Sequence, residues 1–440
     1  MTSVDPLSRR TFLALTGALA SACARGGAPP ARVAAATSLS SAKPWETVRA
    51  LFPLTRDHVH LASFLLASHP KPVADAIERY RRELDANPVL TLEREFASNK
   101  QSTRVRANAS AYMGVAPDEI AQTDSTTMGL ATLYNGIRLG PGDEILTTTH
   151  DHYSTHESLR LAAARTGATL RKVALYGDSA AATEDGMTAA LEGALTPRTR
   201  VVAITWVHSS TGVKTPVRRI ADALARAQAS REPRERALLC VDGVHGFGVE
   251  DATMPDLGCD FFVAGCHKWI YGPRGTGILW GRADAMRGLL PTIPPFFGAW
   301  WTAREYGGEP PPIDGRVMSP GGFKSFEHYW ALADAFALHQ EIGKSRIQAR
   351  IHELNRHAKE GLAAMKHVTM RTPMSSAVSS GIVCFEVAGM KPDAVVDKLS
   401  AAKVIGSVTP YRPSFVRIAA SLVNDHEDVD AALRVIRALG

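Results

Sequence analysis

The stretch DGVHGFGVEDATMPDLGCDFFVAGCHKWIYGPRGTG, residues 242–277, holds the residues that decide the fold. Two short apolar runs, LLCVD (238–242) and FFVAG (261–265), have the length of buried strands, and a glycine-containing loop follows each of them. Asp242 ends the first run and Lys268 comes just after the second. Ligands of open α/β sheets bind beyond the carboxyl ends of strands, so both side chains are candidates for a binding site.

Strand-like and helix-like segments alternate on both sides of this stretch. GDEILTTT (142–149), RVVAITWV (200–207) and GTGILWG (275–281) read as strands, whereas RRIADALARAQA (218–229) has helical apolar spacing. The alternation predicts an α/β fold with a mainly parallel sheet sandwiched by helices. This alternation ends near residue 285, where a Pro- and aromatic-rich segment begins. The strand-like and helix-like segments that follow predict a smaller α+β domain.

Length and composition set limits on the possible functions. The 440 residues are 45% hydrophobic, enough for a sizeable core and two domains. The net charge is +6, but the basic residues are scattered, as at Arg218–Arg226, and form no stripe with interleaved aromatic residues. We therefore expect no nucleic-acid partner.

The N-terminus has the features of an export signal. Two arginines and a short apolar run in SRRTFLALTGALASA (8–22) predict a twin-arginine signal peptide over residues 1–36 and a periplasmic or otherwise exported protein. The run is too short to span a bilayer, so no transmembrane segment is expected. Cleavage near residues 34–36 is preferred over lipid attachment at Cys23. The later cysteines lie mostly in apolar runs and are interpreted as buried thiols: Cys240, Cys259, Cys266 and Cys384.

Two further segments carry candidate residues, each with a simpler alternative. Hydroxyls before a helix-like run in QTDSTTMGLATL (122–133) form either an anion site or a plain helix cap. The histidines of THDHYSTHES (149–158) could suggest a metal, but no carboxylate or cysteine set with ligand spacing accompanies them. Asp242 alone could be a turn residue, and Lys268 alone a lysine that reaches the surface.

Taken together, these elements resemble a known family. The order of a Thr pair, a histidine, DGxH and HK is similar to that of class V, fold-type I pyridoxal-phosphate enzymes, which include cysteine desulfurases, isopenicillin N epimerase-like proteins and kynureninase. The resemblance covers roughly residues 55–440 and is most specific over 242–277. It implies the cofactor pyridoxal 5'-phosphate, a small-molecule amino-acid or peptide-metabolite substrate, and a homodimer.

The resemblance also implies a role for each candidate residue. Lys268 would hold the cofactor through a Schiff base and shuttle the substrate α-proton. Asp242 would pair with the pyridine nitrogen, and Arg417 in FVRIAASLVNDHEDVD would bind the substrate carboxylate. Other residues would contact the cofactor ring or phosphate: Ser125, Thr126, Thr127, His152, Ser209, His245 and His267.

Three departures from the family pattern bear on the function. The segment VIGSVTPYRPSFVR (404–417) has no cysteine where desulfurases carry their nucleophile, so desulfurase activity is not expected. Ser209 stands where desulfurases have Asn, which favours the epimerase-like branch. Phe323 replaces the usual Thr that reaches the partner subunit's phosphate, a contact that Lys324 or Ser325 could supply.

These observations predict an enzyme that removes the α-proton of an amino acid or a derived metabolite, with epimerase-like or aminotransferase chemistry. An exported tailoring enzyme of a siderophore-like peptide metabolite and a non-catalytic binding protein with this fold are the alternatives. The expected organisation is a signal peptide (1–36), a linker and N-terminal segment (37–75), a large cofactor-binding domain (76–310) and a small C-terminal domain (311–440).

Overall fold

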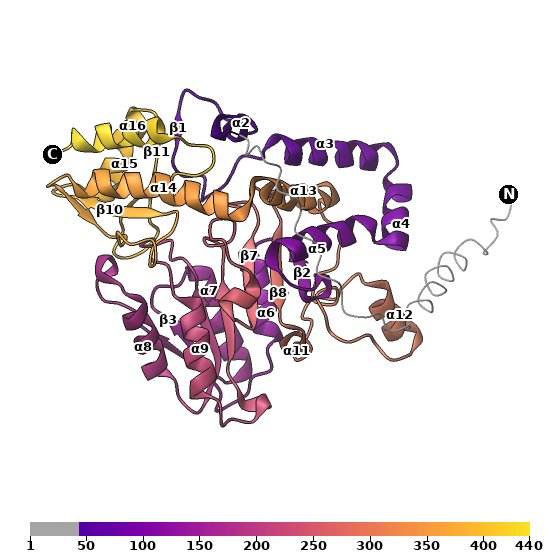
Figure 1. The fold of residues 1–440 in the computed structure, drawn as a ribbon. Helices are drawn as coiled ribbons and strands as arrows, with labels where there is room; N and C mark the ends of the chain where they lie inside the picture. The colour runs from indigo at the N-terminus through magenta and orange to yellow at the C-terminus, as the bar shows by residue number, and fades with distance from the viewer. Residues whose placement is uncertain (1–43) are drawn as a thin grey trace.

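The computed structural model describes residues 44–440. The predicted signal peptide, its paired arginines and Cys23 lie outside the described residues. A large mixed sheet with helices on both faces occupies the middle of the described chain, and smaller sheets lie near the C-terminus (Figure 1).

The large sheet of the described chain has seven strands. Their spatial order is β2 (Ile120–Thr123), β8 (Gly277–Gly281), β7 (Phe261–Gly265), β6 (Leu238–Asp242), β5 (Thr199–Thr205), β3 (Glu144–Thr148) and β4 (Thr169–Val173). All neighbours pair in parallel except β8, which is antiparallel to both β7 and β2. The predicted mainly parallel α/β sheet is therefore confirmed, and β8 is the exception. The connection from β7 to β8 is too short to hold a crossover helix, so the chain turns back on itself.

The sheet buries both faces, which explains why its strands read as continuous apolar runs. In β5, Val202 and Ile204 belong to the core on one face, and Val201 and Ala203 to the core on the other. The first core includes side chains of α5, α8, α9 and α13, and the second those of α6 and α7. The helices of this region are α5 (Lys100–Met113), α6 (Thr126–Gly136), α7 (Tyr153–Thr166), α8 (Glu184–Ala194), α9 (Val217–Ala227), α10 (Met254–Leu257), α11 (Ala283–Met286) and α12 (Gly298–Tyr306).

The C-terminal region builds a second core around smaller sheets. β10 (Val383–Val387) pairs antiparallel with β9 (Val368–Met370) and β13 (Val416–Ile418), and β13 also pairs with β12 (Ser407–Val408). The helices that follow the large sheet are α13 (Phe326–Ile342), α14 (Lys344–Ala363), α15 (Pro392–Ala401) and α16 (His426–Arg437). Val429, Leu433 and Ile436 of α16 are buried, as their helical spacing predicts.

The N-terminal part of the described chain joins both regions. β1 (Val59–His60) pairs in parallel with β11 (Val404–Ile405) of the C-terminal region. α3 (Lys71–Ala86) packs against α13, and α2 (Trp45–Ala50) and α4 (Pro88–Ser98) flank it in the sequence (Figure 1). Short 3₁₀ turns complete the described elements: η1 (Pro117–Glu119), η2 (Ser179–Ala181) and η3 (Pro233–Glu235). The sequence-based domain boundaries stay a prediction.

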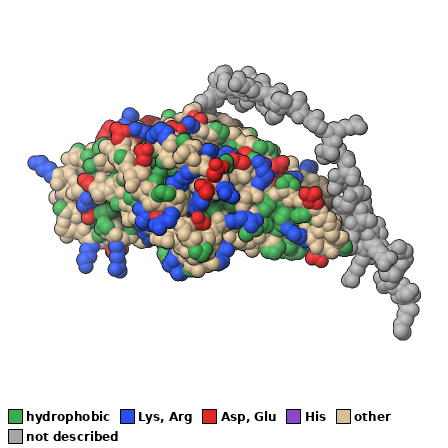
Figure 2. Space-filling view, turned by 90° about the horizontal axis from the view of Figure 1, so that it is seen from below, with side chains coloured by type: hydrophobic (Ala, Val, Ile, Leu, Met, Phe, Trp, Pro, Cys, Tyr) green, Lys and Arg blue, Asp and Glu red, His purple; other side chains and the backbone are tan. Residues whose placement is uncertain are grey.

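The surface and the helix lengths bear on possible partners. On the face in Figure 2, basic side chains are interspersed with acidic ones and are not drawn together into one stripe. Among residues 44–440, no helix combines the length and the apolar character that crossing a membrane requires.

Candidate functional site

A cavity of about 170 Å³ lies beyond the carboxyl ends of the large-sheet strands. The segments after β2, β3, β5, β6 and β7 contribute to it, and β13 and the loop before it supply the opposite side. The cavity brings together all ten residues singled out in the sequence: Ser125, Thr126, Thr127, His152, Ser209, Asp242, His245, His267, Lys268 and Arg417. Strand ends of an α/β sheet and a strand of the second region therefore build one site.

The start of α6 forms one end of the cavity. The Ser125 hydroxyl caps the helix by accepting a hydrogen bond from Met128 N at 3.1 Å, and Thr126 Oγ1 accepts one from Gly265 N at 2.8 Å. A Cβ on Gly265 would lie 2.9 Å from the His267 ring and 3.0 Å from Thr126 Oγ1, so a larger residue would crowd this corner. Backbone N–H groups, hydroxyls and the positive end of a helix suit a phosphate.

A buried carboxylate lies deeper in the cavity. Asp242 is 1% exposed and accepts hydrogen bonds from Val244 N at 3.2 Å and from Thr155 Oγ1 at 3.3 Å. Burial raises the pKa of Asp242 to about 6, although Val244 N–H and the Lys268 charge act against the shift. No described cation forms an ion pair with it. A bound ligand with a protonated ring nitrogen would supply the positive charge that the Asp242 carboxylate lacks, because buried charges require a partner.

Lys268 presents an amine that is easily deprotonated. Burial is the main cause that lowers its pKa to about 8, and Arg417 adds to the effect while Asp242 opposes it. Its Nζ lies 3.5 Å from Nε2 of His245. Nδ1 of His245 accepts a hydrogen bond from the Trp269 indole at 3.3 Å, and burial holds the pKa of this ring well below its usual range. The neutral ring therefore carries its proton on Nε2 and presents it to the lysine, which favours an uncharged amine there.

His152 caps α7 next to this amine. Its Nδ1 lies 2.8 Å from Ser154 Oγ and accepts a hydrogen bond from Ser154 N at 3.2 Å. Burial and the positive charges of Lys268 and Arg417 lower the pKa of His152. A neutral, partly buried ring at this position suits stacking on a flat ligand.

Arg417 lies on β13 and is 3% exposed. Nη1 donates to Ser209 O at 2.8 Å and Nε donates to Ser407 Oγ at 3.0 Å, and the guanidinium lies over the Phe64 ring at 4.5 Å. No described carboxylate forms an ion pair with it. Since a buried guanidinium seeks an anion, a ligand carboxylate is a suitable partner.

Some lining residues were missed from the sequence. Tyr411, in the loop between β12 and β13, shares a 2.6 Å hydrogen bond with the Ser209 hydroxyl. Thr205 Oγ1 at the end of β5 is buried and has no described hydrogen-bond partner. Trp269 was not singled out either; it does not line the cavity but holds His245 there through its indole. Tyr411 could have been found from its place in the polar loop that precedes Arg417.

None of the four cysteines of the described chain lines this cavity. Cys240, Cys259, Cys266 and Cys384 are buried free thiols. Burial raises the pKa of the Cys384 thiol to about 12. None of the four is therefore placed or ionised as a nucleophile for this site.

The remaining sequence candidates lie elsewhere. Nε2 of His156 bonds to Thr148 O at 2.8 Å, and residues 44–440 contain no group of three or more potential metal ligands. Phe323 is 75% exposed, and Lys324 Nζ donates to Pro320 O at 2.9 Å. Neither Lys324 nor Ser325 lines the cavity. Their predicted contact with a partner subunit's phosphate stays a prediction.

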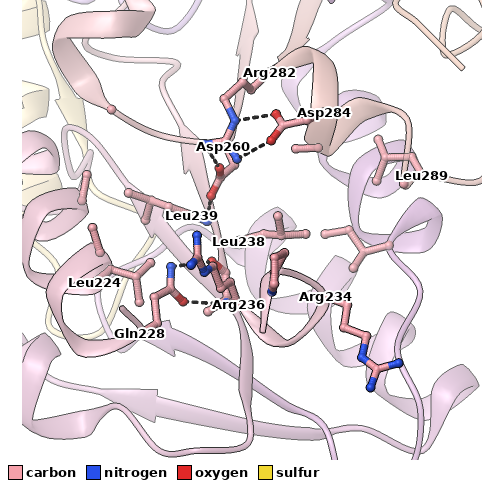
Figure 3. A pocket seen from close by; sticks show the side chains of 18 of the residues that line it. Leu224, Gln228, Arg234, Arg236, Leu238, Leu239, Asp260, Arg282, Asp284 and Leu289 are labelled. Atoms are coloured by element: carbon pink, nitrogen blue, oxygen red, sulfur yellow. Dashed lines mark hydrogen bonds and ion pairs between the residues drawn. The ribbon is translucent and has the colours of Figure 1, made fainter. Parts of the chain in front are cut away.

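A larger hollow, of about 820 Å³, lies at the opposite edge of the sheet (Figure 3). Its principal charged contact is internal, since Arg282 pairs with Asp260 at 2.7 Å and with Asp284 at 2.6 Å. The hollow contains no lysine or histidine. The smaller cavity, with its amine, carboxylate and guanidinium, is the candidate active site.

The donor set of that cavity fits pyridoxal phosphate. A phosphate suits the start of α6, a protonated pyridine nitrogen suits Asp242, and an aldehyde suits the Lys268 amine. The unpaired hydroxyl of Thr205 supplies a further polar atom toward such a ligand.

Comparisons with known proteins point to the same chemistry. A cysteine desulfurase of Pectobacterium carotovorum is 29% identical over 367 residues, covering 78% of this chain and 83% of its own. Isopenicillin N epimerase of Streptomyces clavuligerus is 26% identical over 410 residues, covering 90% and 98%. The solved complex of the cystine C–S lyase C-DES with cysteine persulfide has a TM-score of 0.76 at 23% identity, covering 88% and 99%, and shows likeness of fold.

These findings correct the functional prediction from the sequence. Epimerase-like or aminotransferase chemistry was expected and desulfurase activity was not, yet the relatives and solved neighbours are mainly named cysteine desulfurases. The missing cysteine was given too much weight. Its absence argues only against a persulfide on that loop, because breaking a C–S bond starts with the same loss of an α-proton.

The family itself is established by a match along most of the chain. The sequence model of the aminotransferase class-V family matches residues 66–431. Another structure of C-DES, with a TM-score of 0.77 and 23% identity, contains glycine covalently linked to its PLP cofactor. The fold is that of fold-type I PLP enzymes and the cofactor is pyridoxal phosphate. With its large sheet, its strand-end lysine and this match, the chain belongs to the aminotransferase class-V family of PLP-dependent enzymes.

Proposed function

We propose that this protein cleaves the C–S bond of a cysteine-type amino acid with the help of pyridoxal phosphate. The observation that carries the proposal is one cavity lined by the Lys268 amine, the buried Asp242 carboxylate and the Arg417 guanidinium, which has no described carboxylate partner. The relatives named cysteine desulfurase and the neighbour named cystine C–S lyase support the choice of a sulfur substrate.

The cofactor would be held at three points. The start of α6, with Ser125, Thr126 and Thr127, would bind the phosphate together with His267. Asp242 would face the ring nitrogen and Lys268 would bond to the aldehyde carbon. The ring contacts proposed for the other residues are stacking by His152, a hydrogen bond from His245 to the ring hydroxyl, and a polar contact from Ser209.

The reaction would use the chain's own groups in a simple order. Arg417 would bind the substrate carboxylate with two parallel hydrogen bonds and orient the Cα–H bond. Pyridoxal phosphate supplies the electron sink that makes this bond acidic. Lys268 Nζ would take the α-proton, and the electron pair of the Cβ–S bond would leave with the sulfur.

The chain offers two ways for the sulfur to leave, and the site favours one. A covalent persulfide on the enzyme needs a nucleophilic thiolate, which none of the four buried described cysteines provides. If the sulfur leaves together with the substituent it already carries, the enzyme needs no thiolate. We therefore favour elimination, which would yield pyruvate and ammonium from the amino-acid half.

The test is product analysis with purified holoenzyme. Incubation with L-cysteine, S-methyl-L-cysteine and L-cystine should release pyruvate and a sulfur product, and Lys268→Ala should lose this turnover. A wild-type enzyme that releases neither pyruvate nor sulfur from any of the three would contradict the proposal. An equimolar yield of alanine and enzyme-bound sulfur would replace elimination by persulfide transfer.

Two further features of the protein are proposed with this function. We propose a homodimer, supported by exposed apolar side chains such as Leu66, Phe296 and Phe323, and light scattering of the holoenzyme tests it. We also propose export through the twin-arginine signal, supported by the SRRTFL sequence. Export would place the protein in the periplasm, and Arg9→Lys with Arg10→Lys should retain it inside the cell.

A further inference from the structure

Tyr411 is a cavity residue that the proposed cofactor and substrate contacts leave without a role. It lies in the loop between β12 and β13 and lines the cavity together with Lys268 and Arg417. Its hydroxyl shares a 2.6 Å hydrogen bond with Oγ of Ser209, and its ring meets the His152 ring edge-on, with the ring centres 6.1 Å apart. These contacts hold a phenol at the active site, on the side formed by the C-terminal region.

One serine connects Tyr411 to the proposed carboxylate site. Arg417 Nη1 donates to the backbone oxygen of Ser209 at 2.8 Å, and the Tyr411 hydroxyl meets the side chain of the same residue. A substrate whose carboxylate is bound by Arg417 carries its sulfur only two bonds from Cα. In a cavity of about 170 Å³, the sulfur and the phenol are therefore neighbours.

The phenol of Tyr411 is a hydrogen-bond donor at neutral pH. Burial raises its pKa to about 12, although the Ser209 hydroxyl and the Arg417 charge oppose the shift. A thiol has an ordinary pKa of about 8.5, so the phenol holds its proton more firmly than a departing sulfur would. Ser209 can donate to the phenol oxygen, which leaves the phenol proton to face a ligand. Tyr411 is therefore suited to donate a hydrogen bond to an anion while keeping its proton.

From this geometry we infer that the Tyr411 hydroxyl donates a hydrogen bond to the sulfur as the Cβ–S bond breaks. The inference rests on the proposed C–S cleavage and adds a catalytic residue to it. Lys268 Nζ takes the α-proton, the electron pair of the Cβ–S bond leaves with the sulfur, and the phenol stabilises the charge that develops there. The thiolate takes a proton from water, Lys268 returns the α-proton to water, and water converts the remaining three-carbon fragment into pyruvate and ammonium. No oxidant or reductant is consumed.

The contribution of this hydrogen bond depends on the leaving group. A thiolate concentrates its charge on one sulfur and is a base, so a donor beside it lowers the barrier to its departure. Chloride is a far weaker base and leaves without such help. Loss of the phenol therefore slows the departure of a thiolate more than the departure of chloride from the same position on Cβ.

The test measures pyruvate release by holoenzyme from two compounds. One is the sulfur compound that wild type cleaves fastest among L-cysteine, S-methyl-L-cysteine and L-cystine, and the other is β-chloro-L-alanine, which releases chloride. For Tyr411→Phe we expect kcat to fall by about tenfold or more with the sulfur compound and by less than about threefold with β-chloro-L-alanine. Tyr80→Phe is the matched control, because it removes a phenol hydrogen bond of 2.8 Å, to Gln101, outside the cavity, and should change neither rate.

A second readout distinguishes this role from support of the shape of the site. The side chain of L-alanine has no leaving group, so exchange of its α-proton with deuterated water needs Lys268 and Arg417 but not the phenol. Tyr411→Phe holoenzyme should catalyse this exchange within about twofold of the wild-type rate, as measured by mass spectrometry.

Two results would overturn the inference, and failure of the proposed function differs from both. If Tyr411→Phe slows the sulfur compound and β-chloro-L-alanine by the same factor, or slows neither, the phenol does not act on the sulfur. If α-proton exchange falls together with pyruvate release, Tyr411 only supports the shape of the site. A wild-type enzyme that releases pyruvate from none of the three sulfur compounds shows instead that the proposed function fails, and the inference fails with it.

Discussion

The buried Lys268 amine lies at the end of a chain of contacts that runs from the Trp269 indole through the His245 ring. Trp269 can only donate through its indole, which fixes Nδ1 of His245 as an acceptor and leaves the proton on Nε2. That proton faces Lys268 Nζ at 3.5 Å. A donor facing the amine stabilises its neutral form, so the residue next to the lysine in sequence acts on it through a third side chain.

Trp269→Phe should therefore raise the pKa of Lys268 above its present value of about 8. Without the indole donor, the His245 proton is no longer confined to Nε2, so the hydrogen bond to the neutral amine weakens, and complete loss of that bond, about 1 kcal/mol, sets an upper limit of just under one pKa unit. The rate at which the cofactor-free protein takes up pyridoxal phosphate should then reach its midpoint at a higher pH. Trp280→Phe is the matched control, because it also loses an indole hydrogen bond, to Glu119, far from the amine. An equal shift of the uptake midpoint in both variants would show that the contacts from Trp269 through His245 do not set the pKa of Lys268.

Much of the site could be predicted at the residue scale, and the exceptions have a physical reason. Asp242 and Lys268 follow apolar runs, so sequence order alone places them at a sheet edge. The roles of Trp269 and Tyr411 depend on contacts with residues that are distant in sequence or set by side-chain direction. The order of residues in a sequence does not show which ring nitrogen of His245 accepts a hydrogen bond.

At the scale of elements, α6 is the part that joins fold and cofactor. Its cap, Ser125, comes two residues after the end of β2, and its first turn opens into the cavity. The alternation of strands and helices predicted this arrangement. It did not predict the antiparallel β8, because strand direction follows from the length of the β7–β8 connection and from pairing with β2.

Replacing the Ser125 cap distinguishes the contribution of α6 to stability from its contribution to phosphate binding. Ser125→Ala removes the acceptor of Met128 N and should lower the free energy of unfolding by about 1 kcal/mol. It should also weaken pyridoxal phosphate binding by at least threefold, because the hydroxyl lies at the phosphate end of the cavity. Thr183→Ala removes the equivalent cap of α8, which accepts from Gly186 N at 3.1 Å away from the cavity. Equilibrium dialysis and urea unfolding of both variants check this, and equal cofactor affinities would count against phosphate binding at α6.

At the scale of the whole molecule, the active site requires the large-sheet region and the C-terminal region to keep a fixed position relative to each other. Asp242 and Lys268 belong to the large sheet, whereas Arg417 belongs to the C-terminal sheet. A buried polar cluster around Glu250 joins these two parts. Glu250 accepts hydrogen bonds from Lys214 at 2.8 Å and from Ser380 at 2.6 Å, and its other contact is His352 on α14 at 2.8 Å.

Glu250→Gln should weaken the contact between the large-sheet region and the C-terminal region. Burial alone would raise the pKa of Glu250, but His352 and Lys214 outweigh it and hold the pKa below its usual value. A lowered pKa contributes stability above the ordinary value near 4.5 and loses it as the pH falls below that value. Wild type should therefore exceed the variant by about 3 kcal/mol in free energy of unfolding at pH 7, and the gap should narrow toward pH 3.

The same substitution should act on the reaction in a particular way. Because it shifts Arg417 relative to Lys268 without touching the cofactor cradle, the KM for a free α-carboxylate substrate should rise severalfold while pyridoxal phosphate affinity changes little. Asp75→Asn, which removes the exposed Lys71–Asp75 pair of α3, is the control and should cost less than about 0.5 kcal/mol with no change in KM. A Glu250→Gln enzyme with wild-type KM and lowered stability would show that the cluster supports the fold alone, and that other contacts keep Arg417 in place.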